Sequence, residues 1–132
     1  MLSFEDFRPE DTTPGTGMPI YQQILRHVRR GIAAGVVLDG DEMPSRRVLS
    51  ALLGVNPNTI QKAYRILEEE GLITSHAGAK SLISLDEEKI ARVREDLLET
   101  EVRAAATMLR NTGLTLERAK ELLEHYWKEQ HP

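Results

Sequence analysis

Apolar residues recur along the chain with spacings that predict a series of helices. In the first of these, branched apolar residues fall at every fourth position: Ile20, Ile24, Val28 and Ile32. This spacing places the side chains on one stripe of a helix. Gly35 is a natural end for the helix, because glycine readily adopts the left-handed conformation found just beyond helix C-termini. A helix is therefore predicted between Pro19 and Gly35.

Two further helices separated by a tight turn are predicted within residues 44–71. Ser45 can cap the first of them, since its hydroxyl can accept a hydrogen bond from a free backbone N–H, and Gly54 ends it. Asn56 can cap the second, with Pro57 at the first helical position, where its missing N–H costs nothing. Residues at helical spacing supply the inward face of this second helix: Ile60, Ala63, Tyr64 and Leu67. The pattern is that of a helix-turn-helix.

A β-hairpin is predicted next. Residues 72–76 and 81–85 are strand candidates, and the segment between them carries Gly78, a turn residue. Because Pro44 restricts the preceding residue to an extended conformation, a short strand is predicted to end there as well. A helix-turn-helix followed by a hairpin makes a winged helix, and the pattern predicts one over residues 18–85.

Residues 86–132 are predicted to form a two-helix antiparallel hairpin. Asp86 can cap the first helix, Gly113 lies in the break, and Thr115 can cap the second. The apolar stripes are wider than one hairpin can cover, so we expect a second copy of the chain to cover them in a two-fold homodimer. The residues expected at that interface are apolar or aromatic: Leu97, Leu98, Val102, Ala105, Leu109, Leu116, Leu123, Tyr126 and Trp127.

Residues 1–17 show no sustained periodicity and contain two prolines and two glycines. A partly disordered N-terminal arm is the favoured interpretation. The alternative is that Leu2, Phe4 and Phe7 order the arm by packing on the folded part of the chain. The predicted fold is thus mainly α with a small β-hairpin, comprising an arm, a winged helix-turn-helix and a dimerisation module.

Charge divides along the same boundaries. The net charge of the chain is −4, yet residues 18–85 hold eight bases and six acids, while the segments before and after them are each acidic by three charges. Phosphate contacts dominate affinity for nucleic acid, and few bases are available here to make them. We therefore expect a single chain to bind nucleic acid with modest affinity, and we expect dimerisation to raise it.

Several kinds of chemistry are excluded. There is no cysteine, and the four histidines lack the spacing or carboxylate company of a metal site. No nucleophile–base pair or glycine-rich phosphate loop is present, so neither an enzymatic activity nor a cofactor is expected. No apolar run has membrane-spanning length and the first residues are acidic, so we expect a cytoplasmic protein without a membrane partner.

Polar side chains gather where a helix-turn-helix would meet double-stranded DNA, at the starts of its helices. Asn58 and Gln61 are candidate base readers, because both types can pair bidentately with adenine, whereas Thr59 and Lys62 are candidates for phosphate contacts. The last three residues of the predicted DNA-binding set belong to the hairpin, the wing. The whole set is Ser45, Arg46, Arg47, Asn56, Asn58, Thr59, Gln61, Lys62, His76, Gly78 and Lys80. The alternatives are ordinary surface polarity and a winged helix that docks a protein instead of DNA.

The sequence resembles the GntR family of bacterial transcriptional regulators, because several of its motifs match those of the family in register. The matching segments are residues 19–24, 35, 39–41, 43–47, 53–59, 63–64 and 67–73. The resemblance implies that Arg47 contacts DNA and that Gly78 lets the wing backbone approach the minor groove. The short tail is similar to the YtrA-like branch, whose tail is a dimerisation hairpin and whose members commonly repress transporter genes. A homodimeric repressor on an inverted-repeat operator is the implied function, controlled either by a small-molecule effector of unknown identity or by concentration alone.

Overall fold

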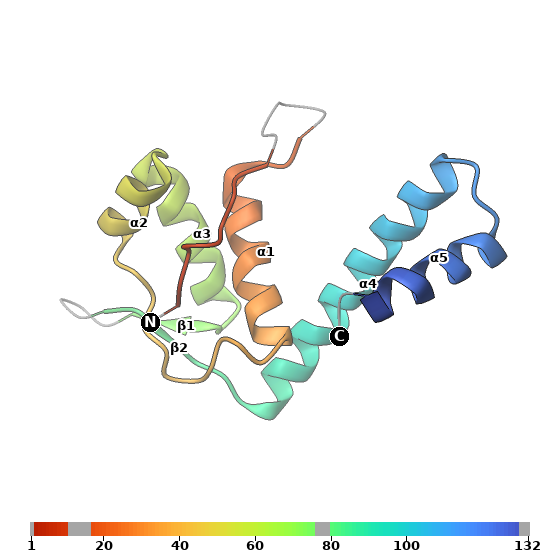
Figure 1. The fold of residues 1–132 in the computed structure, drawn as a ribbon. Coiled ribbons are helices and arrows are strands. Elements are labelled where there is room, and N and C mark those ends of the chain that lie inside the picture. Colours follow the sequence, from red (N-terminus) through yellow and green to blue (C-terminus); the bar gives the residue numbers. More distant parts are fainter. Residues whose placement is uncertain (1, 11–16, 76–79, 130–132) are drawn as a thin grey trace. The chain divides into compact units, whose positions relative to one another are not determined.

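The computed structural model describes residues 2–10, 17–75 and 80–129. Five helices and two strands follow one another in these residues (Figure 1): α1 (Ile20–Ala33), α2 (Arg46–Leu53), α3 (Pro57–Glu69), β1 (Ile73–Thr74), β2 (Leu82–Ile83), α4 (Glu87–Asn111) and α5 (Leu116–Glu129). The chain divides into two compact units, residues 1–97 and 98–132. We call their described residues the winged-helix unit and the tail unit.

The predicted helix caps of the helix-turn-helix are confirmed. The Ser45 hydroxyl accepts a hydrogen bond from the backbone N–H of Val48 at 3.1 Å, and Gly54 ends α2 with a φ of 65°. Asn56 Oδ1 accepts from the backbone N–H of Asn58 at 2.8 Å. These bonds satisfy backbone donors that a helix leaves unpaired at its start. The starts of α2 and α3 are therefore determined by local chemistry.

The hairpin has a shorter ladder than the sequence predicts. Strands β1 and β2 pair antiparallel with Ile73 opposite Ile83, and an isolated bridge joins Glu42 to Leu82. Leu72 does not extend β1, because its N–H donates to the carbonyl of Leu67 at 2.9 Å and so completes the end of α3. The extended segment before Pro44 does contribute to the hairpin, through the Glu42 bridge.

The core of the winged-helix unit lies where α1 and α2 pack on α3 and the hairpin closes one end. Its largest fully buried side chains come from all of these elements: Tyr64, Ile24, Ile32, Met43, Leu49, Ile60, Leu67, Leu72, Ile83, Val28 and Val37. The first turns of α4 also belong to it, since Val93 is buried in the same cluster. By packing, this unit therefore extends past residue 85 to Leu97.

The favoured interpretation of the arm is wrong for residues 2–10. Leu2, Phe4 and Phe7 are buried in the core, and the backbone N–H of Leu2 donates to the carbonyl of Glu42 at 2.7 Å. The rings of Phe4 and Phe7 lie 4.6 and 5.4 Å from that of His27, between centroids. Burial of three large apolar side chains offsets part of the entropy cost of ordering this segment. Residues 11–16 lie outside the described residues.

The buried side chain of Gln23 holds the same arm by its backbone. Its Oε1 accepts from the N–H of Glu10 at 2.6 Å, and its Nε2 donates to the carbonyls of Glu10 and Met18 at 3.2 and 2.7 Å. Arg26 adds an ion pair with Glu10 at 2.8 Å. A buried amide needs such partners, and here two of the three bonds go to the backbone of Glu10 in the arm and the third to Met18.

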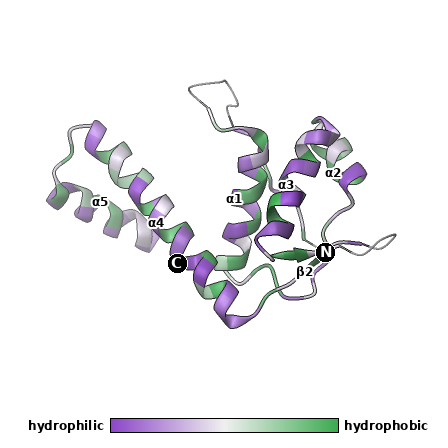
Figure 2. Cartoon of the chain, turned by 180° about the vertical axis from the view of Figure 1, so that it is seen from behind, coloured by the Kyte–Doolittle hydropathy of each residue, from purple (hydrophilic) through white to green (hydrophobic). Residues whose placement is uncertain are grey.

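The tail unit consists of the end of α4, a turn and α5. The turn contains Gly113 with a φ of 84°, and the Thr115 hydroxyl accepts from the backbone N–H of Arg118 at 3.2 Å, as predicted for a cap. Apolar and polar residues alternate along both helices (Figure 2), and within one chain only Ala119 of the described tail residues is buried. No helix in the described parts of the chain is both long and apolar enough to cross a membrane.

Candidate nucleic-acid interface

Three polar side chains at the starts of α2 and α3 are exposed and unpaired. Arg47, Asn58 and Gln61 make no side-chain hydrogen bond or ion pair with any other residue in the described parts of the chain. All three lie within the first two turns of their helices, at the end where the helix dipole favours an anion. The arrangement leaves a guanidinium and two carboxamides available to a ligand.

Lys62 lies on the same helix but already has an internal contact. Its Nζ is 4.0 Å from the centre of the Tyr21 ring, which brings α1 to the edge of the site. Such cation–π contacts at exposed positions are worth about 0.5–1 kcal/mol. Thr59 is half-buried beside it. A phosphate could therefore draw Lys62 off the ring at small cost.

Ser45 and Asn56 are in the predicted set, but the structure commits their side-chain oxygens to the helix caps described above. Their contribution is to hold the first turns of α2 and α3. Tyr64 is a core residue, as its helical spacing predicts. Its hydroxyl donates to the carbonyl of Pro44, and burial raises its pKa well above the ordinary value, although the positive charge of Arg46 opposes this.

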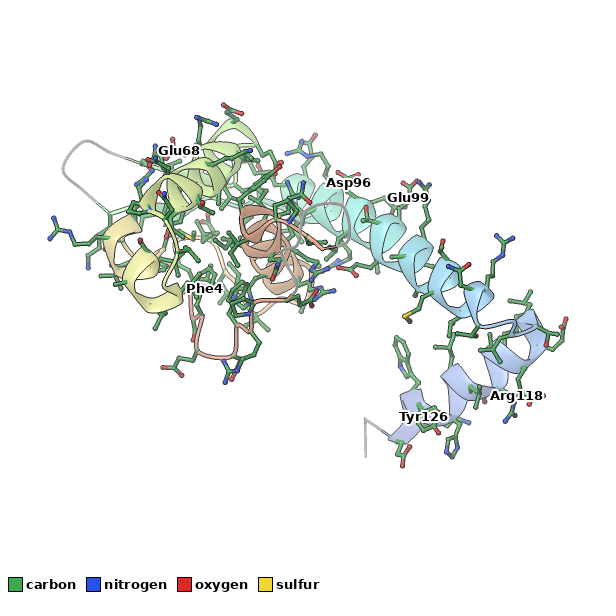
Figure 3. All side chains as sticks on the ribbon, turned by 90° about the horizontal axis from the view of Figure 1, so that it is seen from above. Phe4, Glu68, Asp96, Glu99, Arg118 and Tyr126 are labelled. Atoms are coloured by element: carbon green, nitrogen blue, oxygen red, sulfur yellow. The ribbon has the colours of Figure 1, made fainter. Side chains whose placement is uncertain are left out.

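The structure places Arg46 in an internal ion pair. One of its Nη atoms lies 2.7 Å from Oε1 of Glu68, and its guanidinium carbon lies 4.8 Å from the centre of the Tyr64 ring. Figure 3 shows Glu68 on α3, within the winged-helix unit. Sequence reasoning missed Glu68. The available signal was a basic side chain in the first turn of α2, where the helix dipole disfavours it without a compensating acid.

The wing is the hairpin with its turn, residues 72–85, and the structure describes it except for residues 76–79. Lys80 is exposed, and its Nζ lies 3.1 Å from Oε2 of Glu42. The predicted contacts His76 and Gly78 lie outside the described residues. Among the residues that the structure does describe, no group of three or more histidine or acidic side chains could hold a metal ion.

The residues predicted at the dimer interface form an apolar surface in the isolated chain. Leu97 and Leu109 are half-buried, and the other seven are exposed. Tyr126, which Figure 3 shows on α5, is 55% exposed and Trp127 is 70% exposed. The tail unit therefore leaves several large apolar side chains uncovered within one chain.

A model of the bacterial regulatory proteins of the gntR family matches residues 20–83. The HTH-type transcriptional repressor YtrA of Bacillus subtilis is 37% identical over 90 residues, which cover 64% of this chain and 69% of that protein. The chain belongs to the GntR family. It is a DNA-binding transcriptional regulator of that family, as its motifs predict.

Solved structures of a GntR-family protein and of an operator-bound domain agree with the fold. A GntR family transcriptional regulator from Listeria monocytogenes has a TM-score of 0.71 at 27% identity, covering 89% of this chain and 98% of that one. AraR(DBD), solved in complex with operator ORX1, has a TM-score of 0.51 at 25% identity, covering 58% of this chain and 93% of that one. The predicted winged-helix fold is confirmed, and both YtrA and the Listeria protein are transcriptional regulators.

Proposed function

We propose that this GntR-family chain is a homodimeric repressor that binds an inverted-repeat operator, with one copy of α3 in each of two major-groove segments. The observation that carries the proposal is the set of polar side chains on the starts of α2 and α3 that have no partner among the described residues. Two-fold symmetry of the protein would be mirrored in the DNA, with half-sites one helical turn apart, ~34 Å.

The polar residues divide into two roles. Asn58 and Gln61 read base edges, because a carboxamide can donate and accept to one adenine. Arg47, Thr59 and Lys62 hold phosphates and so determine the register of α3. In the wing, His76, Gly78 and Lys80 approach the minor groove beside the same half-site.

Dimerisation supplies what one chain lacks. Residues 18–85 carry a net charge of only +2, so few phosphates can be neutralised by a single copy. The exposed side chains of the tail unit, among them Leu123, Tyr126 and Trp127, supply the apolar surface for a second copy. Each large apolar side chain that becomes buried contributes about 1.5–3 kcal/mol.

The regulated genes are proposed to encode a transporter, because the chain resembles YtrA-like regulators in its short tail as well as in its winged helix. No cofactor enters the proposal. Control comes either from a small-molecule effector or from the concentration of the regulator alone, and binding assays on the dimer separate the two.

Selection from sheared genomic DNA, followed by footprinting and light scattering, tests the proposal. The expected result is an inverted repeat with two protected patches one helical turn apart, bound by a particle with the mass of two chains. A monomer protecting one asymmetric site would overturn the dimeric mode. Failure to retain any DNA at low salt would instead favour the use of the winged helix for docking a protein. Lys120→Ala, an exposed substitution outside the residues proposed to contact DNA or the second copy, is the control.

A further inference from the structure

A chain of polar contacts joins α2 and α3 to both legs of the wing. It begins with the Arg46–Glu68 ion pair, 2.7 Å between Nη2 and Oε1. The same Oε1 accepts a hydrogen bond from the Ser75 hydroxyl at 2.7 Å. Ser75 and Ser81 are joined hydroxyl to hydroxyl at 2.7 Å. Because Ser75 follows β1 and Ser81 precedes β2, the last contact closes the wing where its two legs leave the body of the unit.

The Arg46 side chain is held on several sides. Its guanidinium lies over the Tyr64 ring, whose own hydroxyl is tied to the Pro44 carbonyl. Its Nε is buried and has no acceptor among the described residues, so the side chain is enclosed as far as the guanidinium. The side chains of Arg46 and Glu68 are 36% and 35% exposed. To reach a phosphate, Arg46 would have to give up the carboxylate and the ring together.

Ser81 anchors the other end of the chain of contacts. It is only 6% exposed, and its carbonyl accepts from the backbone N–H of Met43 at 2.9 Å. Met43 is itself a core residue directly before the segment that leads into α2. The position of the wing is thus linked to the reading helices by side chains as well as by the short β ladder.

We propose that Arg46 and Glu68 are positioning residues, which hold the base of the wing at a defined place beside α3, and that Arg46 is not a phosphate contact. The inference rests on the proposed DNA-binding function and deepens it. Arg47 is the next residue in the chain and has no partner in the part of the chain that the structure describes, so it is the phosphate contact from the start of α2. Adjacent arginines in one motif therefore have separate roles, one toward DNA and one toward the wing.

Salt dependence of operator binding separates the two roles. Each phosphate contact contributes about 0.9 to the slope of log affinity against log salt. Arg47→Ala is expected to lower that slope by about 0.9. Arg46→Ala is expected to weaken operator binding about tenfold, the scale of one charged hydrogen bond, with the slope unchanged. A lowered slope in Arg46→Ala would overturn the inference.

For Glu68→Ala, the two possible roles of Arg46 predict opposite changes in operator affinity. If Arg46 were a phosphate contact, removal of its internal partner and of a negative charge would raise operator affinity. A positioning role predicts that affinity falls severalfold and that hydroxyl-radical protection is lost opposite the wing but retained opposite α3. The exchanged pair Arg46→Glu with Glu68→Arg is expected to recover affinity relative to either single variant, and failure to recover counts against the inference.

Circular dichroism checks that each of these variants folds. Ser75→Ala is a milder second variant, because it leaves both Arg46 and Glu68 in place. It is expected to lower operator affinity and wing protection without a change in salt slope, whereas wild-type affinity and protection in Ser75→Ala would overturn the link to the wing. If the wild-type chain selects no operator at all, the proposed function fails. If it does and Arg46→Ala behaves as Arg47→Ala, only the positioning role fails.

Discussion

Replacing Phe4 with alanine is expected to destabilise the winged-helix unit by about 3 kcal/mol. Phe4 is 4% exposed and packs against Phe7 and His27, with centroid distances of 5.7 and 4.6 Å. Truncation of a buried phenylalanine costs about 3–5 kcal/mol, and a segment near the end of the chain can relax, which favours the lower value. Domains of this size are stable by only about 5–15 kcal/mol, so the loss is large.

Urea unfolding followed by far-ultraviolet circular dichroism measures this change. With a denaturant slope of about 1–3 kcal/mol per molar, the midpoint is expected to fall by at least 1 M. All variants are compared at one protein concentration, because association stabilises the folded state. Glu5→Ala, an exposed position in the same arm, is the matched control and is expected to change stability by less than about 0.5 kcal/mol. Equal midpoints for the two variants would refute the conclusion that the arm is part of the core.

Three further predictions concern the reading face, the tail and the core. Gln61→Ala is expected to weaken operator binding by about 1–3 kcal/mol in a gel-shift assay with no change in melting temperature, and wild-type affinity would exclude base reading there. Leu123→Glu is expected to halve the mass measured by light scattering and to weaken operator binding, whereas a dimer of unchanged mass would place the interface elsewhere. Tyr64→Phe leaves the Pro44 carbonyl without its donor and is expected to cost about 1–3 kcal/mol near neutral pH. Above about pH 10 the Tyr64 hydroxyl ionises in the unfolded chain, whereas its raised pKa keeps it protonated in the folded chain. The stability of the wild-type chain is therefore expected to fall as the pH rises above about 10. The same loss of stability in Tyr64→Phe would contradict that linkage.

The helices and their ends were predictable because their causes are local. Ser45 and Asn56 cap helices through bonds that span two or three residues, and Gly54 ends α2 through its own backbone conformation. The winged-helix class followed from the order of these elements. The hairpin was predicted with strands that were too long, since the competing use of the Leu72 N–H at the end of α3 depends on how that helix finishes.

The candidate site was predictable in its location more than in its internal roles. Asn58 and Gln61 are exposed at the start of α3, as their positions in the motif indicate. Lys62 and Arg46 carry the same positive charge in neighbouring elements, and no local rule assigns Lys62 to the Tyr21 ring and Arg46 to Glu68. Their partners are known only once the helices have packed.

The sequence by itself therefore determined the family, the order of the elements and the positions where helices begin and end, because each depends on residues a few places apart. Tertiary structure decided which side chains remain available to DNA and whether the arm is ordered. Arg46 meets Glu68 from 22 residues away, and Phe4 meets His27 from 23. Contacts over such separations depend on how α2 packs on α3 and how the arm packs on α1, and no periodicity in the chain encodes them.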